Sequence, residues 1–176
     1  MKKLETHTEK ICGFYVSDLH LTTMILPYIN KKIKENFNIV TILQNNIEDN
    51  IAKLLSRLNL KNDKEILKID WKACKDIKNN ELEKKLACDI IKNKNNIVFI
   101  SGSKEYIDKI NKILDKWIFE NKNSLGTVKI INCYEVTEFN ESIHEILDVH
   151  DKILNTSGEK YIYEVFEGYQ NVEEIS

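Results

Sequence analysis

The chain has 176 residues, of which 42% are hydrophobic and 31% are charged, and its formal net charge is −2. This length and this apolar content suffice for one packed domain. The near-neutral charge and a single arginine, Arg57, exclude a strongly basic surface, so we expect no direct binding of nucleic acid.

Apolar runs of two kinds alternate along the chain. Short runs rich in β-branched residues predict five strands, at Ile11–Val16, Ile39–Leu43, Ile66–Ile69, Ile97–Ile100 and Val128–Tyr134. Because these runs are continuously apolar, we expect them to be buried on both faces, as in a parallel sheet. Stretches of helical period lie between and after them, at 19–34, 47–58, 82–91, 107–118 and 139–154.

This alternation predicts an α/β fold of three layers, with a mostly parallel five-stranded sheet and helices on both of its faces. No repeat or linker divides the chain, so we treat residues 1–176 as a single domain with its core at 10–155. Gly158 is the expected stop of the long helix that follows the last strand. An extra C-terminal helical segment is predicted at 159–172.

The first predicted strand runs into Ser17-Asp18-Leu19-His20. This stretch resembles the opening of the calcineurin-like metallophosphoesterases, in which an Asp and a His at a strand end hold the first of two metal ions. The family's later turns are missing, because no glycine here is followed by Asp, Asn-His or His. We therefore predict no metal site and no catalytic residue. Asp18 is interpreted as a helix N-cap, and a divergent metal-dependent phosphoesterase that uses Asp18 and His20 is kept as an alternative.

Polar residues at the strand ends are the candidates for a ligand site, because ligands of open α/β sheets bind beyond the carboxyl ends of the strands. They are Ser17, Asp18, Thr22, Asp70, Trp71, Ser101, Gly102, Ser103 and Glu135. The first strand-to-helix turn has neither the glycine nor the lysine of a phosphate loop. We therefore predict no nucleoside triphosphatase and no cofactor.

Pro27 is the only proline, and it lies within the predicted helix Leu19–Lys34. Proline cannot donate to the carbonyl oxygen four residues earlier, so we expect a kink or a restart of the helix. The first turn, Leu19–Thr23, is then either a movable flap over the strand ends or part of a purely structural kink.

The C-terminal segment is a candidate surface for a protein partner. Its aromatic residues are Tyr161, Tyr163, Phe166 and Tyr169, more than one helix face can bury. The alternative is that this segment covers the edge of the sheet. A homodimer is also left open.

Neither a membrane nor an oxidising compartment is indicated. No apolar run reaches transmembrane length, and the segment before Cys12 is too charged for a signal peptide. The four cysteines, at positions 12, 74, 88 and 133, show no C-x-x-C spacing, which favours reduced thiols in the cytoplasm.

Two segments resemble a known family. ICGFYVSD, followed by ILPYINKKIKENFNIVTIL, is similar to the start of the MEDS domain, the methanogen/methylotroph sensory domain, and VKIINCYEVTEFNESIHEIL resembles its closing segment. The resemblance spans residues 7–155. One departure is that Lys10 replaces the family's His before Ile-Cys, with His7 three positions earlier. The resemblance implies a RecA-like (Rossmann-like) fold without a phosphate loop, and sensing of small organic or hydrocarbon-derived ligands in signalling and transcription.

We therefore expect a non-catalytic, cytoplasmic sensory or regulatory domain that binds a small organic ligand and signals through a regulatory protein partner. The alternatives are the phosphoesterase described above and a ligand-free protein-interaction module.

Overall fold

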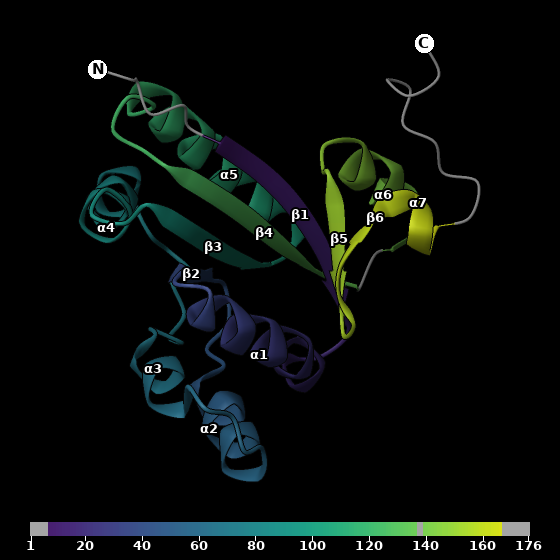
Figure 1. Cartoon of the computed structure of the whole chain (residues 1–176). Helices are drawn as coiled ribbons and strands as arrows, with labels where there is room; N and C mark the ends of the chain where they lie inside the picture. The colour runs from purple at the N-terminus through teal and green to yellow at the C-terminus, as the bar shows by residue number, and fades with distance from the viewer. Residues whose placement is uncertain (1–6, 137–138, 167–176) are drawn as a thin grey trace.

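The computed structural model describes residues 7–136 and 139–166 (Figure 1). In chain order the elements are β1 (His7–Tyr15), α1 (Asp18–Lys34), β2 (Asn38–Leu43), α2 (Glu48–Arg57), α3 (Asp63–Lys68), α4 (Asn79–Ile90), β3 (Asn95–Gly102), α5 (Lys104–Glu120), β4 (Thr127–Glu135), α6 (Phe139–Asp148), β5 (Lys152–Asn155), β6 (Gly158–Tyr161) and α7 (Ile162–Val165). No helix among the described residues is long and apolar enough to cross a membrane.

The described strands form one six-stranded sheet in the order β2-β3-β4-β1-β5-β6. Every neighbouring pair is parallel except β5 and β6, which form an antiparallel hairpin. Helices α1, α2 and α3 cover one face of the sheet, and α4, α5 and α6 cover the other (Figure 1). The predicted three-layer, mostly parallel α/β fold is confirmed.

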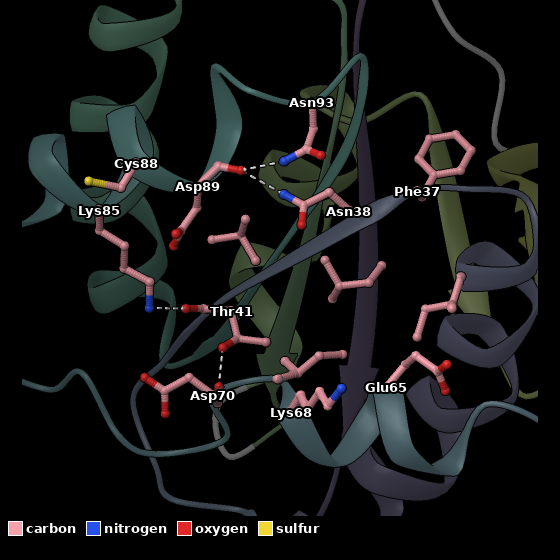
Figure 2. A pocket seen from close by; sticks show the side chains of 14 residues that line it. Phe37, Asn38, Thr41, Glu65, Lys68, Asp70, Lys85, Cys88, Asp89 and Asn93 are labelled. Carbon is pink, nitrogen blue, oxygen red and sulfur yellow. Dashed lines mark hydrogen bonds between the residues drawn. The ribbon is translucent and has the colours of Figure 1, made fainter.

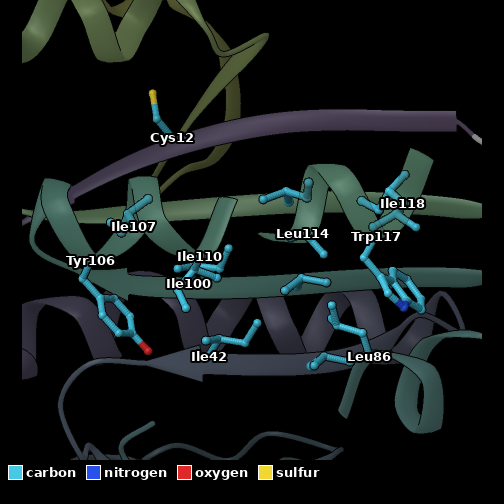
Figure 3. Close-up of a cluster of buried hydrophobic side chains, with 14 of the residues drawn as sticks. Cys12, Ile42, Leu86, Ile100, Tyr106, Ile107, Ile110, Leu114, Trp117 and Ile118 are labelled. Atoms are coloured by element: carbon cyan, nitrogen blue, oxygen red, sulfur yellow. The ribbon is translucent and has the colours of Figure 1, made fainter. Parts of the chain in front are cut away.

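Each face of the sheet has its own hydrophobic core. Along β2, Val40 and Ile42 point to the α4–α5 side, while Ile39 and Leu43 point to the α1–α3 side. This two-sided burial explains the continuously apolar strand sequences, because helices cover both faces of the sheet and neither face of these strands meets water. Figure 3 shows the α5 stripe, with Ile110 among its members, packed over strand side chains of the first core.

One predicted strand is wrong, because Ile66–Ile69 belongs to α3 and its C-cap. Ile66 is fully buried, whereas Leu67 is 55% exposed. Burial on one side only suits a helix. Two apolar residues three positions apart satisfy the helical period as well as a short strand does, so this run was ambiguous.

The chain after α6 also differs from the prediction. The expected long helix ends at Asp148, and the strands β5 and β6 follow it. The short helix α7 lies within the predicted segment 159–172, so the C-terminal helix is confirmed, although it is shorter than predicted. Gly158 does not stop a helix. It ends a hairpin turn with φ +102°, a conformation that favours glycine. In the same turn, the Asn155 side chain accepts a hydrogen bond from the backbone N–H of Ser157 at 2.8 Å.

Helix α1 continues through Pro27 from Asp18 to Lys34, without the predicted restart. Its first turn is not a separate flap, because Leu21 and Thr22 are 1% and 0% exposed. The predicted N-cap is wrong by one residue. Ser17 has the extended backbone of a cap, and Asp18 is the first helical residue.

Candidate functional site

Hydrogen bonds within the fold occupy several of the predicted ligand residues at the strand ends. The Ser17 hydroxyl accepts a hydrogen bond from a first-turn N–H of α1 at 3.1 Å. Ser103 caps α5 in the same way, at 3.2 Å. The Thr22 hydroxyl donates to the carbonyl oxygen of Asp18 at 2.8 Å. These side chains therefore stabilise the strand-to-helix turns.

Three predicted residues lie together at the carboxyl ends of the neighbouring strands β3 and β4, namely Ser101, Gly102 and Glu135. In the register of the strands, Gly102 pairs with Tyr134, and Glu135 pairs with Tyr15. Burial and then the charge of Glu135 raise the pKa of Tyr15, whose side chain is hydrogen-bonded to Ser101. The side chains of Tyr15 and Ser101 therefore bond to each other within the fold.

Gly102 is required by close packing against Gln44. Its φ is +145°, and a Cβ at this position would lie 2.3 Å from the Gln44 side-chain oxygen. That oxygen accepts the N–H of Ser103 at 2.8 Å. The Ser-Gly-Ser turn thus joins β3 to α5 and to the end of β2.

The Asp18-Leu19-His20 motif closes the β1–α1 turn. The Nδ1 atom of His20 accepts a hydrogen bond from the backbone N–H of Val16 at 3.1 Å. Among the described residues, no group of three or more His, Cys, Asp or Glu side chains is placed to hold a metal ion. The local contacts of His20 belong to the turn itself.

Asp70 and Trp71 lie apart from the other predicted residues, beyond the outer edge of β2. Trp71 is 2% exposed, and its indole N–H donates to the carbonyl oxygen of Ile66 at 2.8 Å, so it belongs to the core. Asp70 is exposed and lines an open pocket.

This pocket has a volume of about 560 Å³ and lies along β2, between α3 on one side and α4 on the other (Figure 2). It is a consequence of the strand order, since β2 is the edge of the sheet and the two helices belong to opposite layers. We call it the edge pocket. Its floor is the outer side of β2 from Asn38 to Thr41.

The backbone of β2 exposes hydrogen-bonding groups to the edge pocket. In an edge strand, the backbone N–H and C=O groups of one residue point to the neighbouring strand, and those of the next residue point away from it. The N–H of Gln44 bonds to β3, whereas the carbonyl oxygens of Thr41 and Leu43 accept from groups outside the sheet. Ile39 and Thr41 are therefore the outward residues in the pocket. Within the described chain, no hydrogen bond is made by the Ile39 N–H, the Ile39 carbonyl or the Thr41 N–H.

A lysine from α4 enters the same pocket. The Lys85 ammonium donates to the Thr41 carbonyl at 2.7 Å and lies 3.9 Å from the Cys74 sulfur. Its side chain is partly buried, and no described carboxylate lies within ion-pair distance of it. An ammonium group has three donors, so Lys85 can still donate to an anion in the pocket.

The remaining walls of the edge pocket are mixed in character. Ile33, Phe37 and Ile69 give it an apolar side. Asp89, one helical turn after Lys85, and Asp70 bring negative charge to the rim (Figure 2). A few polar groups over apolar walls are typical of small-molecule sites.

No protein-family model matches this chain, and no curated protein matches it.

A second cavity, of about 350 Å³, lies over a buried polar chain on the other face. The side chains of Asn111 and Asn132 bond to each other at 2.8 and 3.2 Å, and Asn132 Nδ2 lies 2.9 Å from His150 Nε2. The other ring nitrogen of His150 faces the carbonyl of Ile146. Burial lowers the pKa of His150 to about 4. Because these polar groups satisfy one another, the cluster is complete without a ligand.

The predicted partner residues are only in part exposed. Tyr161 and Tyr163 are 49% and 52% exposed, and their rings stack with centroids 5.5 Å apart. Phe166 is partly buried and packs against the core on the α5 side. Tyr169 lies outside the described residues.

Sequence reasoning missed the central residues of the edge pocket, namely Lys85 and the backbone of Ile39 and Thr41. Nothing in their local sequence distinguishes them, because Lys85 is one of many lysines. Their role depends on β2 being at the edge of the sheet. The strand order was needed to find them.

Proposed function

We propose that this chain is a non-catalytic sensory or regulatory domain that binds a small organic ligand in the edge pocket and signals through a protein partner in the cytoplasm. The observation that carries the proposal is the edge pocket, where free backbone groups of β2 and the Lys85 ammonium face a cavity of about 560 Å³. This volume lies within the usual range for small-molecule sites. The resemblance of residues 7–155 to the MEDS domain supports the same class of function.

The position of the pocket suits a regulatory role. Its walls come from α3 in one helical layer and from α4 in the other. A ligand that contacts both helices favours the arrangement in which both contacts are made, and it shifts the population of the domain towards that arrangement. The ligand thereby changes the surface that α3 and α4 present to a partner.

The exposed tyrosines offer a second, separate surface for a protein partner, at and beyond the end of β6, at the opposite edge of the sheet from the edge pocket. Tyr161 and Tyr163 stack on each other at the surface, beside Val165, which is 41% exposed. Tyrosines are enriched at protein interfaces, because one ring offers both apolar area and a hydroxyl.

The ligand site is tested by a fragment screen on the full chain, followed by backbone amide resonances in NMR. We expect binding fragments to shift the amides of Ile39 and Thr41. Fragments that shift only resonances remote from β2, or a diverse library with no hits at the edge pocket, would remove the basis of the proposal.

The partner surface is tested by replacing both exposed tyrosines, Tyr161→Ser and Tyr163→Ser, in one chain. Co-purification of a partner from the native cell extract should be lost. Phe119→Ser is the matched control, because Phe119 is 70% exposed on α5, away from this surface. Equal loss in both variants would contradict the assignment.

A further inference from the structure

The free part of the β2 edge is short. Beyond Thr41 the edge is already occupied, because residue 73 pairs with Leu43 as a parallel bridge, and the N–H of Cys74 donates to the Leu43 carbonyl at 2.6 Å. The open groups are therefore limited to Ile39 and Thr41. At about 3.3 Å per residue, this stretch accommodates two or three residues of an extended chain.

The edge is also recessed. Val40 and Thr41 are each 3% exposed, and the helices α3 and α4 rise on either side of the strand (Figure 2). The β2 edge of a second copy lies in the same recess between its own helices, so the two edges cannot meet. A narrow single segment can enter the groove, but a folded sheet edge cannot.

The Ile39 carbonyl and the Thr41 N–H can both form hydrogen bonds with one residue of an added parallel strand. Such a residue, placed opposite Val40, donates its N–H to the Ile39 carbonyl and accepts a hydrogen bond from the Thr41 N–H. The accepting oxygen then lies beside the Thr41 carbonyl, to which the Lys85 ammonium already donates at 2.7 Å. A carboxylate at this position receives hydrogen bonds from both Thr41 and Lys85, and it forms a direct ion pair with Lys85, which has no described carboxylate within ion-pair distance although Asp70 and Asp89 line the same pocket.

From these contacts we infer that the edge pocket binds a short peptide with a free C-terminal carboxylate, as an added parallel strand whose last residue lies opposite Val40. The inference rests on the proposed function and names its ligand class. Asp89, which lines the pocket beside Asn38, lies towards the amino end of such a peptide. The apolar residues Ile33, Phe37 and Ile69 face its side chains.

The test uses trialanine with free ends, and trialanine amide as the uncharged comparison, titrated into the full chain and followed by NMR. We expect the free peptide to shift the amide resonances of Ile39 and Thr41. Amidation should weaken binding about tenfold, because it removes the charge that pairs with the partly buried Lys85 ammonium.

Lys85→Met keeps the side-chain stem and removes the charge, so it should weaken binding of the free peptide to the level of the amide. Lys84→Met is the matched control, because Lys84 is the exposed neighbour on the same helix. Equal affinities of the free peptide and the amide for the wild-type chain would overturn the inference, whatever the stability of the variants. If fragments bind at Ile39 and Thr41 but trialanine does not, the ligand class is wrong and the proposed function stands. If neither binds there, both fail.

Discussion

At the scale of single residues, His150 is a buried base held in its neutral form. Asn132 donates to its Nε2, so the proton lies on Nδ1, which donates to the Ile146 carbonyl. A proton added at Nε2 would face the Asn132 amide group without an acceptor. Desolvation by burial is the largest cause that lowers its pKa, from 6.5 to about 4, and the charge of Lys10 acts in the same direction.

The free energy of unfolding should therefore depend on pH through His150. Between about pH 6.5 and pH 4 the unfolded chain binds the proton and the folded chain does not, so stability is lost as the pH falls through this range. At about 1.4 kcal/mol per tenfold difference in proton affinity, the loss approaches about 3 kcal/mol at pH 4. Urea unfolding at a series of pH values measures it. His150→Gln should flatten the dependence, whereas His144→Gln, an exposed control on α6, should retain it.

Ser17 and Asp18 make different contributions at the start of α1. Ser17→Ala removes the side chain that caps the helix and should lower the free energy of unfolding by about 0.5–2 kcal/mol. Asp18→Ala removes only a favourable charge at the helix N-terminus and should cost about 0.3–1 kcal/mol. Ser17→Asp, which retains a capping oxygen, is the control for urea denaturation. A larger loss in Asp18→Ala than in Ser17→Ala would contradict this assignment of the cap.

At the scale of elements, four charged side chains join the strands on the α1 side of the sheet. Lys129 of β4 pairs with Glu9 of β1 at 3.7 Å and with Glu159 of β6 at 3.1 Å. Lys152 of β5 pairs with the same two carboxylates, at 3.0 and 3.6 Å. Their side chains are only 14–25% exposed. The set therefore fixes the β5–β6 hairpin to the parallel strands more firmly than exposed ion pairs do.

Glu159→Gln should destabilise the fold by about 1–3 kcal/mol, because it leaves two partly buried ammonium groups with one carboxylate. Burial alone raises the pKa of Glu159, but hydrogen bonds from Tyr28 and Lys129 and the charge of Lys129 outweigh it and lower that pKa. The stabilisation is thus present above about pH 4.5 and is lost as the pH falls below it.

Thermal and urea unfolding of this variant should accordingly approach the wild-type values in acid. Glu120→Gln is the matched control, because Glu120 lies 3.9 Å from Lys116 in an exposed pair. Its effect should stay below about 0.5 kcal/mol. A loss in Glu159→Gln that is independent of pH would show that the charge is not the cause.

Some elements of the fold could be predicted from the sequence, and others could not. Strands β1, β2, β3 and β4 were predicted within a few residues, because two-sided burial gives long runs of Ile and Val. The prediction failed for Ile66–Ile69 and for the β5–β6 hairpin. Two to four apolar residues fit the helical period and the strand period equally well. The edge pocket depends on strand order, which no local pattern encodes.

At the scale of the whole molecule, the last described strand and helix, β6 and α7, make contacts on both faces of the sheet. Glu159 bonds to charged groups on the α1 side, while Ile162, 6% exposed, packs into the core on the α5 side. The segment after Gly158 therefore ties the two layers together across the outer edge of the sheet. This placement agrees with the alternative interpretation of the C-terminal segment as a cover for that edge, while its exposed tyrosines remain the proposed partner surface.

Truncation after Gly158 should consequently weaken the whole fold. It removes the Glu159 contacts and the buried Ile162 side chain, whose burial alone is worth about 1.5–3 kcal/mol, so we expect a total loss of about 3–5 kcal/mol. The urea midpoint followed by circular dichroism measures this loss. The Tyr161→Ser, Tyr163→Ser chain is the matched control, since it keeps both contacts and changes two exposed side chains. An unchanged midpoint after truncation would mean that β6 and α7 only cover the domain, and the tyrosine surface could then be deleted without loss of the fold.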